Sequence, residues 1–298
     1  MVVMDVFITG IIMGTFYALM ALGLSLIFGS LKIVNFAHGE FFMIGAYAYA
    51  LIAINLKIPL FFVLFSVVFI GIILGVVVER LLMRPLYQKF TEWGAMRDEY
   101  AIIVTFGLSL FLMNLANQIF GPYPISGPGL RPLRERIMVG DIVMMSSHRI
   151  IAFGVGAGVL IIAILLVRYS PWGKVIQAVS QNRFGASIAG INSTQVSSIV
   201  FGISGALAGL SGALLCPIFS AEPFVGALPG VKSFIIVVLG GMGSVPGSIL
   251  GAYLLGVLEQ FGAVYISYTY RDTFGFLILI LVLLLRPQGI FGEKAREV

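Results

Sequence analysis

Long apolar segments separated by short polar ones dominate the chain and predict membrane-spanning helices. A helix needs about 20 apolar residues to cross a bilayer. Seven segments meet this requirement: 6–28, 59–82, 100–120, 150–167, 194–216, 247–267 and 273–285. Two weaker segments, 38–54 and 229–243, are interrupted by polar residues or by glycines. We therefore expect an all-α polytopic transmembrane bundle of about nine crossings, with eight as the nearest alternative and with interrupted helices at the two weak segments.

The composition supports a membrane protein. Hydrophobic residues make up 59% of the 298 residues and charged residues only 10%, whereas a soluble domain carries about 25% charged residues. The polar stretches are too short to fold alone, so residues 1–298 are expected to form a single transmembrane domain. The opening MVVMDV has no basic region and precedes a long apolar run, so we interpret the first segment as a retained span rather than a signal peptide.

The distribution of basic residues predicts the orientation. Nine crossings with the N-terminus outside place eleven of the eighteen Lys and Arg residues on the inner side and seven on the outer side. Loops on the cytoplasmic side of a membrane protein carry an excess of Lys and Arg. The N-terminus is therefore expected in the periplasm and the C-terminus in the cytoplasm. The loop at about 121–149 opposes the bias with four arginines, but it also holds Glu135 and Asp141. The net charge of +5 therefore indicates topology and not nucleic-acid binding.

Residues typical of catalysis, cofactor binding or metal binding are scarce. The chain has two histidines and one cysteine, Cys216, which excludes a disulfide and makes a hydrolase triad or a metal cage improbable. No Walker A sequence occurs, so any ATP hydrolysis must belong to another chain. We expect no cofactor, no metal and no enzymatic activity.

Two apolar segments resemble each other and suggest an internal repeat. Tyr17 to Ser30 aligns with Gly205 to Ile218 when Leu19 is set on Leu207. Each is followed by a polar-tinged interruption, VNFAHGEF in the first case and SAEPFVGALPG in the second. Transporters are often built from repeats with interrupted helices at matched positions.

Five polar residues are candidates for a transport path because ionisable groups at membrane depth are costly unless paired or facing water. They are Asn35, His38, Glu40, Glu222 and Glu259. For the first three, the alternative is an interfacial turn whose side chains satisfy helix ends. For Glu259, the alternative is an internal pair with a polar neighbour.

The segment SPWGKVIQAVSQNRFGASIAGIN predicts a short amphipathic helix too polar to span the membrane. Ser170 suits an N-cap, Pro171 the first helical position and Gly190 the C-terminal cap. Small residues recur on one face, which leaves two interpretations: a surface for a partner, or a connecting helix lying on the bilayer. Further along, Gly247, Gly251 and Gly256 form a small-residue face suited to close helix packing.

Four stretches together resemble the LivH-type permease subunit of branched-chain amino-acid ABC importers, over essentially the whole chain. They are ALGLSLIFGSLKIVNFAHGEFFMIGAY, SPWGKVIQAVSQNRFGASIAGI, LGGMGSVPGSILGAYLLGVLE and LLLRPQGIFG.

The resemblance implies an inner-membrane permease that moves amino acids to the cytoplasm by alternating access. It implies four partners: a second, LivM-like permease, two cytoplasmic ATPase subunits and a periplasmic binding protein, which the loop 121–149 would receive. It also implies that residues 174–190 couple to the ATPase. The coupling residues would be Lys174, Gln177, Ala178, Asn182, Gly185, Ala186 and Gly190.

Alternatives remain at this level. The same machinery imports urea, short amides or aromatic acids in relatives with these motifs. An ion-coupled secondary transporter using Glu40, Glu222 or Glu259, or a passive channel, would work without an ATPase.

Overall fold

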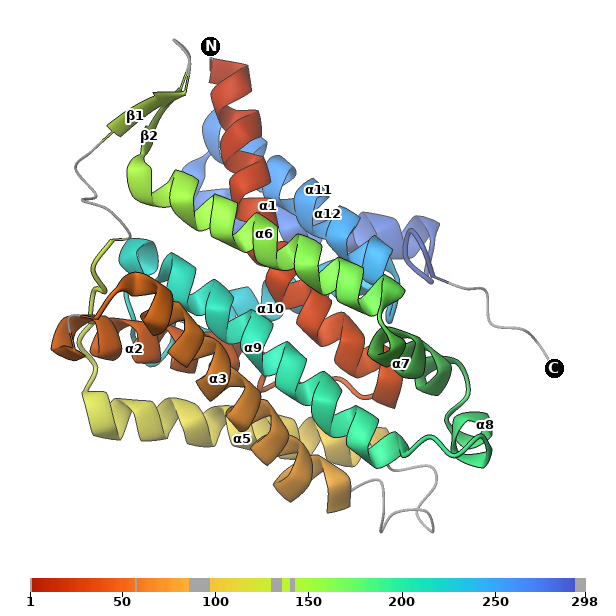
Figure 1. Cartoon of the computed structure of the whole chain (residues 1–298). Coiled ribbons are helices and arrows are strands. Elements are labelled where there is room, and N and C mark those ends of the chain that lie inside the picture. Colours follow the sequence, from red (N-terminus) through yellow and green to blue (C-terminus); the bar gives the residue numbers. More distant parts are fainter. Residues whose placement is uncertain (1, 57, 86–96, 130–135, 140–142, 293–298) are drawn as a thin grey trace.

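The computed structural model describes residues 2–56, 58–85, 97–129, 136–139 and 143–292, and most of them lie in helices (Figure 1). The elements are α1 (Val2–Leu31), α2 (His38–Leu56), α3 (Leu60–Val78), the π-helical turn η1 (Glu79–Met83), α5 (Arg97–Phe120), β1 (Arg136–Val139), β2 (Val143–Ser146), α6 (Ser147–Tyr169), α7 (Pro171–Gln181), α8 (Arg183–Ile188), α9 (Ser193–Phe219), α10 (Ala227–Gly240), α11 (Val245–Tyr265), η4 (Tyr268–Tyr270) and α12 (Arg271–Leu285). The predicted polytopic helical bundle is confirmed. The β1–β2 hairpin, which the sequence did not predict, is the one pair of strands in the described part.

Eight helices of the described chain are long and apolar enough to cross a membrane. The ninth predicted segment, α10, has 14 residues and is therefore about 21 Å long, shorter than the roughly 30 Å hydrocarbon core. The non-helical residues 220–226 lead from the end of α9 into α10, so this segment is interrupted as the sequence predicts.

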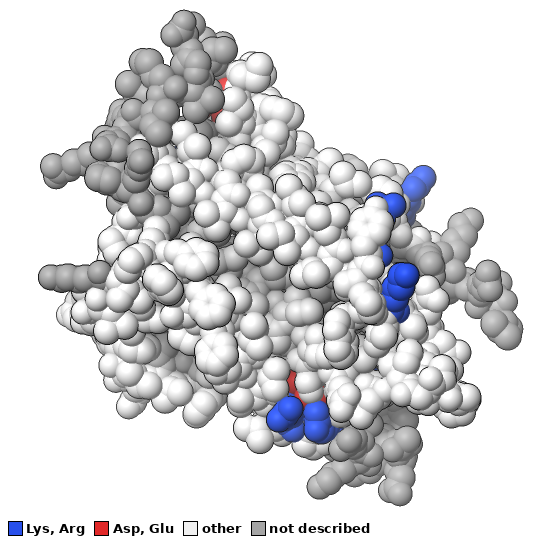
Figure 2. Space-filling model, in the orientation of Figure 1, with Lys and Arg blue, Asp and Glu red and all other residues white. Residues whose placement is uncertain are grey.

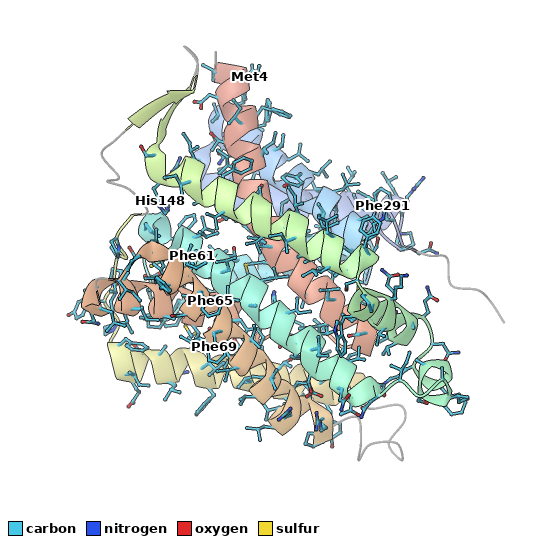
Figure 3. All side chains as sticks on the ribbon, viewed as in Figure 1. Met4, Phe61, Phe65, Phe69, His148 and Phe291 are labelled. Carbon is cyan, nitrogen blue, oxygen red and sulfur yellow. The ribbon has the colours of Figure 1, made fainter. Side chains whose placement is uncertain are left out.

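The face of the bundle in Figure 2 carries its charge at the margins. The visible Lys and Arg side chains lie along the right edge, the side that carries α7 and α8 in Figure 1, and at the bottom, and the broad middle is uncharged. Figure 3 shows Phe61, Phe65 and Phe69 of α3 pointing outward from the uncharged region, and all three are exposed. Such an apolar outer surface is suited to lipid.

The helices α1 and α9 form the core. Most residues in their apolar stretches are buried, whereas most of those in α3, α5, α6 and α12 face outward. α1 packs along α11, α9 packs along α3, and α1 also contacts α9. The two core helices run in opposite directions in Figure 1, because α1 ends beside α7 and α9 begins there.

The two halves of the chain repeat one order of elements in opposite directions. α1, α2 and α3 correspond to α9, α10 and α11, and each core helix packs against the third helix of the other half. The alignment that sets Leu19 on Leu207 also sets Lys32 on Ser220. These are the two non-glycine residues of the described chain with positive φ, 57° and 60°, and each ends a core helix. The structure thus supports the internal repeat expected from the sequence, in inverted form.

The two interruptions cross inside the bundle. Residues 32–37 are not helical and lead into α2, and residues 220–226 lead into α10. A Cβ built on Gly39 would overlap the carbonyl oxygen of Gly226, and one built on Gly226 would overlap that of Gly39. The start of α2 and the chain entering α10 therefore meet backbone to backbone. We name this contact, with Gly230 beside it, the glycine crossing.

The loop after α5 fastens the second interruption. Ile125 and Ala221 exchange two backbone hydrogen bonds, of 2.9 and 2.8 Å, and the Ser126 and Ser220 hydroxyls lie 2.7 Å apart. Residues 130–135 and 140–142 of the expected 121–149 loop lie outside the described residues. The described part of the loop is thus tied to the chain that enters α10.

We expect Gly205→Ala to destabilise the protein, because its Cβ would overlap the Gly71 carbonyl where α9 meets α3. Overpacking of this kind costs about 1–3 kcal/mol. Gly107→Ala on α5 is the matched control, since Gly107 is exposed and has open space around its Cβ position. Thermal unfolding in detergent should give a lower Tm for Gly205→Ala only. Equal Tm values for the two variants would contradict close α3–α9 packing.

Candidate functional site

His38 fastens the start of α2 to both core helices. Its Nε2 lies 2.9 Å from the Met20 carbonyl oxygen of α1, and its Nδ1 lies 3.4 Å from the Ser204 hydroxyl of α9. A carbonyl only accepts, so Nε2–H donates and Nδ1 is the acceptor for Ser204. With the side chain 1% exposed, His38 acts as a buried connector beside the glycine crossing.

Asn35 and Glu40 lie on either side of His38 and are also buried. The Asn35 Oδ1 accepts from the Ala37 N–H at 3.1 Å, which bends the chain into α2. Glu40 Oε1 accepts from the Ser109 hydroxyl of α5 at 2.8 Å. The Asn35 Nδ2 and the Glu40 Oε2 have no hydrogen-bond partner among the described residues. The three side chains therefore contact different helices and do not converge on one ligand.

Glu259 belongs to a charged cluster between α1, α10, α11 and α12. Its Oε2 lies 2.8 Å from the Lys232 Nζ and accepts from the Tyr17 hydroxyl at 2.9 Å. Lys232 also lies 2.7 Å from Asp272 Oδ1, and the Arg271 Nε is 3.7 Å from Glu259 Oε2. The internal pairing that the sequence left open for Glu259 is the arrangement observed.

Sequence reasoning missed four members of this cluster: Tyr17, Lys232, Arg271 and Asp272. Lys232 and Arg271 were counted as outer-loop cations, but both are largely buried in ion pairs. A signal was available, because Lys232 and Glu259 are single, opposite charges in two otherwise apolar helices. Buried charges of this kind persist when they are paired.

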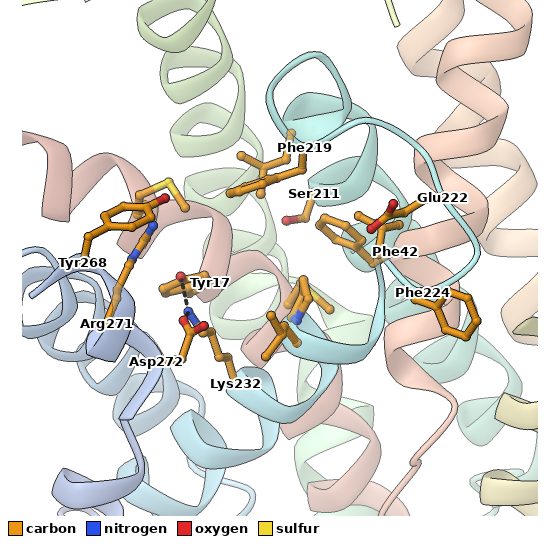
Figure 4. Close-up of a pocket in the computed structure, with 16 residues that line it drawn as sticks. Tyr17, Phe42, Ser211, Phe219, Glu222, Phe224, Lys232, Tyr268, Arg271 and Asp272 are labelled. Atoms are coloured by element: carbon orange, nitrogen blue, oxygen red, sulfur yellow. Dashed lines mark hydrogen bonds and ion pairs between the residues drawn. The ribbon is translucent and has the colours of Figure 1, made fainter. Parts of the chain in front are cut away.

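A cavity of about 270 Å³ adjoins the cluster (Figure 4). Its charged wall contains Lys232, Arg271 and Asp272, and its apolar wall contains side chains from α1, α2, α9 and α10. Glu222 lies on the far side of the cavity in Figure 4. Of the five predicted path residues, only Glu222 lines this cavity directly, while Glu259 supports it from behind.

The predicted amphipathic helix at 174–190 is two helices. Ser170 caps α7, accepting from the Gly173 N–H at 3.0 Å, with Pro171 at the first turn. The chain then leaves helical geometry at Asn182, whose Oδ1 accepts from the Gly185 N–H at 2.8 Å and so caps α8. Gly190 follows α8 with φ +83°. The expectation of one continuous helix was wrong because the Asn182 side chain starts a second one.

The expected coupling residues do not share one exposed face. Ala186 is 6% exposed and packs inside, and Gln177 donates to the Val167 carbonyl of α6 at 2.8 Å. Lys174, Asn182 and Gly190 are exposed, and Ala178 and Gly185 are half-buried. The exposed apolar residues of α8 are Phe184 and Ile188, at 75% and 73%. Four residues apart, they share one side of the helix, and we call them the α8 knob.

The expected packing glycines all lie at contacts within the chain. Gly247 meets the Gly240 backbone of α10, and Gly251 lies against Leu239 and Ile236 of the same helix. A Cβ on Gly256 would lie 2.6 Å from the Gly10 carbonyl oxygen of α1. The small-residue face of α11 thus packs against α10 near its start and against α1 further along.

No group of three or more His, Cys, Asp or Glu residues that could hold a metal occurs in the described part of the chain.

Comparison with known proteins agrees with this geometry. The family described as the permease component of branched-chain amino acid transport systems matches residues 6–284. The permease protein LivH of Salmonella typhimurium LT2 is 33% identical over 97% of this chain and 95% of its own. BraD of Pseudomonas aeruginosa is 35% identical over 97% of this chain and 96% of its own.

A second kind of permease from the same transport systems also resembles the chain. LivM of Salmonella typhimurium LT2 is 27% identical over 92% of this chain and 67% of its own. No solved structure matches. The length and continuity of the family match lead to one conclusion: the chain belongs to the permease components of branched-chain amino acid transport systems.

Proposed function

We propose that this chain is the membrane permease subunit of an ATP-driven importer of branched-chain amino acids. The observation that carries the proposal is the similarity to LivH and BraD over 97% of the chain. The eight long apolar helices agree with it. The chain itself is not an enzyme, so ATP hydrolysis would take place on separate ATPase subunits.

We propose that the chain lies in a bacterial inner membrane with its α7–α8 end on the cytoplasmic side. Exposed or half-buried cations gather at this end: Lys32, Arg80, Arg84, Arg168, Lys174, Arg183 and Arg286. At the opposite end Arg149 is exposed, while Lys232 and Arg271 are paired with acids. Basic residues are retained on the cytoplasmic side of membrane proteins. The N-terminus would then be periplasmic and the C-terminus cytoplasmic.

The partners would be a second, LivM-like permease, two ATPase subunits and a periplasmic binding protein. The α8 knob is the proposed ATPase contact, because two large apolar side chains protrude beside cations at the cytoplasmic end. The loop 121–149 at the opposite end is the proposed contact for the binding protein. Since that loop is bonded to residues 220–221, docking there would act on the chain that enters α10.

The glycine crossing is the proposed moving element of alternating access. At the crossing the starts of α2 and α10 meet through glycine backbone with no room for a side chain between them, whereas α1 and α9 pack along α11 and α3. Exposed apolar residues flank the crossing, among them Phe36, Leu228 and Val231. This face would lie against the second permease and line the path between the two subunits.

Uptake into proteoliposomes tests the proposed function. With ATPase subunits, a LivM-like permease and the binding protein, leucine uptake should require ATP and be insensitive to dissipation of proton and sodium gradients. This chain alone should transport nothing. Gradient-driven leucine uptake by the chain alone would establish the ion-coupled carrier instead, and ATP-independent equilibration would establish a channel.

The α8 knob gives a second prediction. Phe184→Ala combined with Ile188→Ala should leave the permease folded and lower both ATPase co-purification and ATP-driven uptake by about tenfold or more. Once an ATPase subunit covers them, two side chains of this size would each contribute over about 1 kcal/mol to binding, as at a typical hot spot. Phe65→Ala with Phe69→Ala on the outer face of α3 is the matched control, since both residues are exposed. Equal ATPase recovery from both double variants would exclude the knob as the contact.

A further inference from the structure

The cavity beside the charged cluster has two chemically different walls. Met13, Phe42, Leu215 and Phe219 provide an apolar wall, and Arg271 and Asp272 provide polar groups at the start of α12. Its volume of about 270 Å³ is just below the range of drug-sized ligand pockets. A small molecule with one charged end and one apolar end is the class that fits.

Arg271 lines this space and has buried hydrogen-bond donors that are not used. Its side chain is 14% exposed, and Nε lies 3.7 Å from Glu259 Oε2, too far for a hydrogen bond. Nε and Nη2 have no hydrogen-bond partner among the described residues. Leaving buried donors unsatisfied is costly, and a guanidinium binds a carboxylate through two parallel hydrogen bonds. A carboxylate is therefore the group that would satisfy the unused donors of Arg271.

Lys232 holds the cluster but has no donor left for a ligand. Its ammonium contacts the Tyr17 hydroxyl, Glu259 and Asp272 at 3.0, 2.8 and 2.7 Å, which uses all three of its protons. Asp272 uses only Oδ1 in this contact and is 45% exposed. The other oxygen of Asp272 can accept from an ammonium group next to the carboxylate bound by Arg271.

The charges around the cavity disfavour a ligand with a net negative charge. Two cations, Lys232 and Arg271, are matched by two acids, Glu259 and Asp272. Glu222 adds a third acid on the far side of the cavity, and its negative charge disfavours acidic ligand side chains. A zwitterion with an apolar side chain therefore complements both the charged wall and the apolar wall of the cavity.

We propose that this cavity is a binding site for a zwitterionic α-amino acid with an apolar side chain, within the permease itself. The carboxylate binds Arg271, the ammonium binds Asp272, and the side chain lies against Phe42, Leu215 and Phe219. The site rests on the proposed function and adds a selectivity step to it, since cargo released at the outer end would meet this cavity before the glycine crossing.

Protection from chemical modification tests the site directly. Leu228 lines the cavity and is 54% exposed, so Leu228→Cys in a Cys216→Ala background places one thiol at its edge. In the assembled transporter without binding protein, leucine should slow maleimide modification. Leucinamide, which lacks the carboxylate, and 4-methylpentanoate, which lacks the amine, should do so at least tenfold less well. Equal protection by all three, or slowing by phospholipid but not by leucine, would overturn the assignment.

Transport kinetics separate this proposal from the proposed function. Arg271→Gln should raise the KM for leucine by about tenfold or more, as expected for loss of a charge-assisted pair. Arg271→Lys keeps the charge beside Glu259 but not the two-pronged geometry, and should give an intermediate KM in a stably folded protein. Arg286→Gln, exposed at the other end of α12, is the matched control.

Two outcomes have distinct meanings. ATP-driven leucine uptake with unchanged KM in the folded Arg271→Lys variant, together with absent protection, would remove the site and leave the proposed function standing. Absence of ATP-driven uptake by the wild-type assembly would instead remove the proposed function. Leucine-specific protection would then still establish the site.

Discussion

Gly39 and Gly226 bring the start of α2 against the chain entering α10 so closely that neither position has room for a side-chain carbon. Helix starts expose backbone N–H groups that lipid cannot satisfy, so an interrupted helix is stable only where protein surrounds it. The core helices provide that cover, and His38 bonds the start of α2 to both of them. The inverted order of elements follows, since each half contributes one core helix and one short helix to the same contact.

The crossing differs from the rest of the packing. Glycine-mediated contacts hold α1 to α11, α9 to α3 and α2 to α9 along the helices, whereas at the crossing the starts of α2 and α10 meet through glycine backbone. Two places connect this region to the ends of the bundle. The loop after α5 is bonded to the chain before α10, and at the opposite end α7 packs against α1, whose Met20 carbonyl bonds His38. A binding protein and an ATPase acting at those places would bias one two-state element from both sides.

Much of this fold follows from the sequence, because the apolar runs are long and their ends carry clear signals. The polar string at His38–Glu40 marks the first turn of α2, and Ser170 and Pro171 mark the start of α7. The weak segment at 229–243 was recognised as weak, and α10 is indeed short. In each case the information is local.

What could not be predicted depends on contacts between distant residues. Lys232 and Glu259 find each other only after α10 and α11 pack, and Arg271 and Asp272 join from α12. The division of the segment at 174–190 depends on whether Asn182 caps a new helix or continues the old one, and helical periodicity alone favours the second. For the same reason Ala186 was expected on the partner surface and is buried, whereas Phe184 and Ile188 protrude.

The most direct test of the account is the accessibility of the glycine crossing during the transport cycle. A Phe36→Cys variant in a Cys216→Ala background places a thiol on the exposed residue beside the crossing. In the assembled transporter, the rate of its reaction with a membrane-impermeant maleimide from the periplasmic side would be compared without nucleotide and with ATP trapped. The account predicts a severalfold change in rate between the two states. Equal rates in both states would show that the crossing does not move, and would contradict its role as the gate.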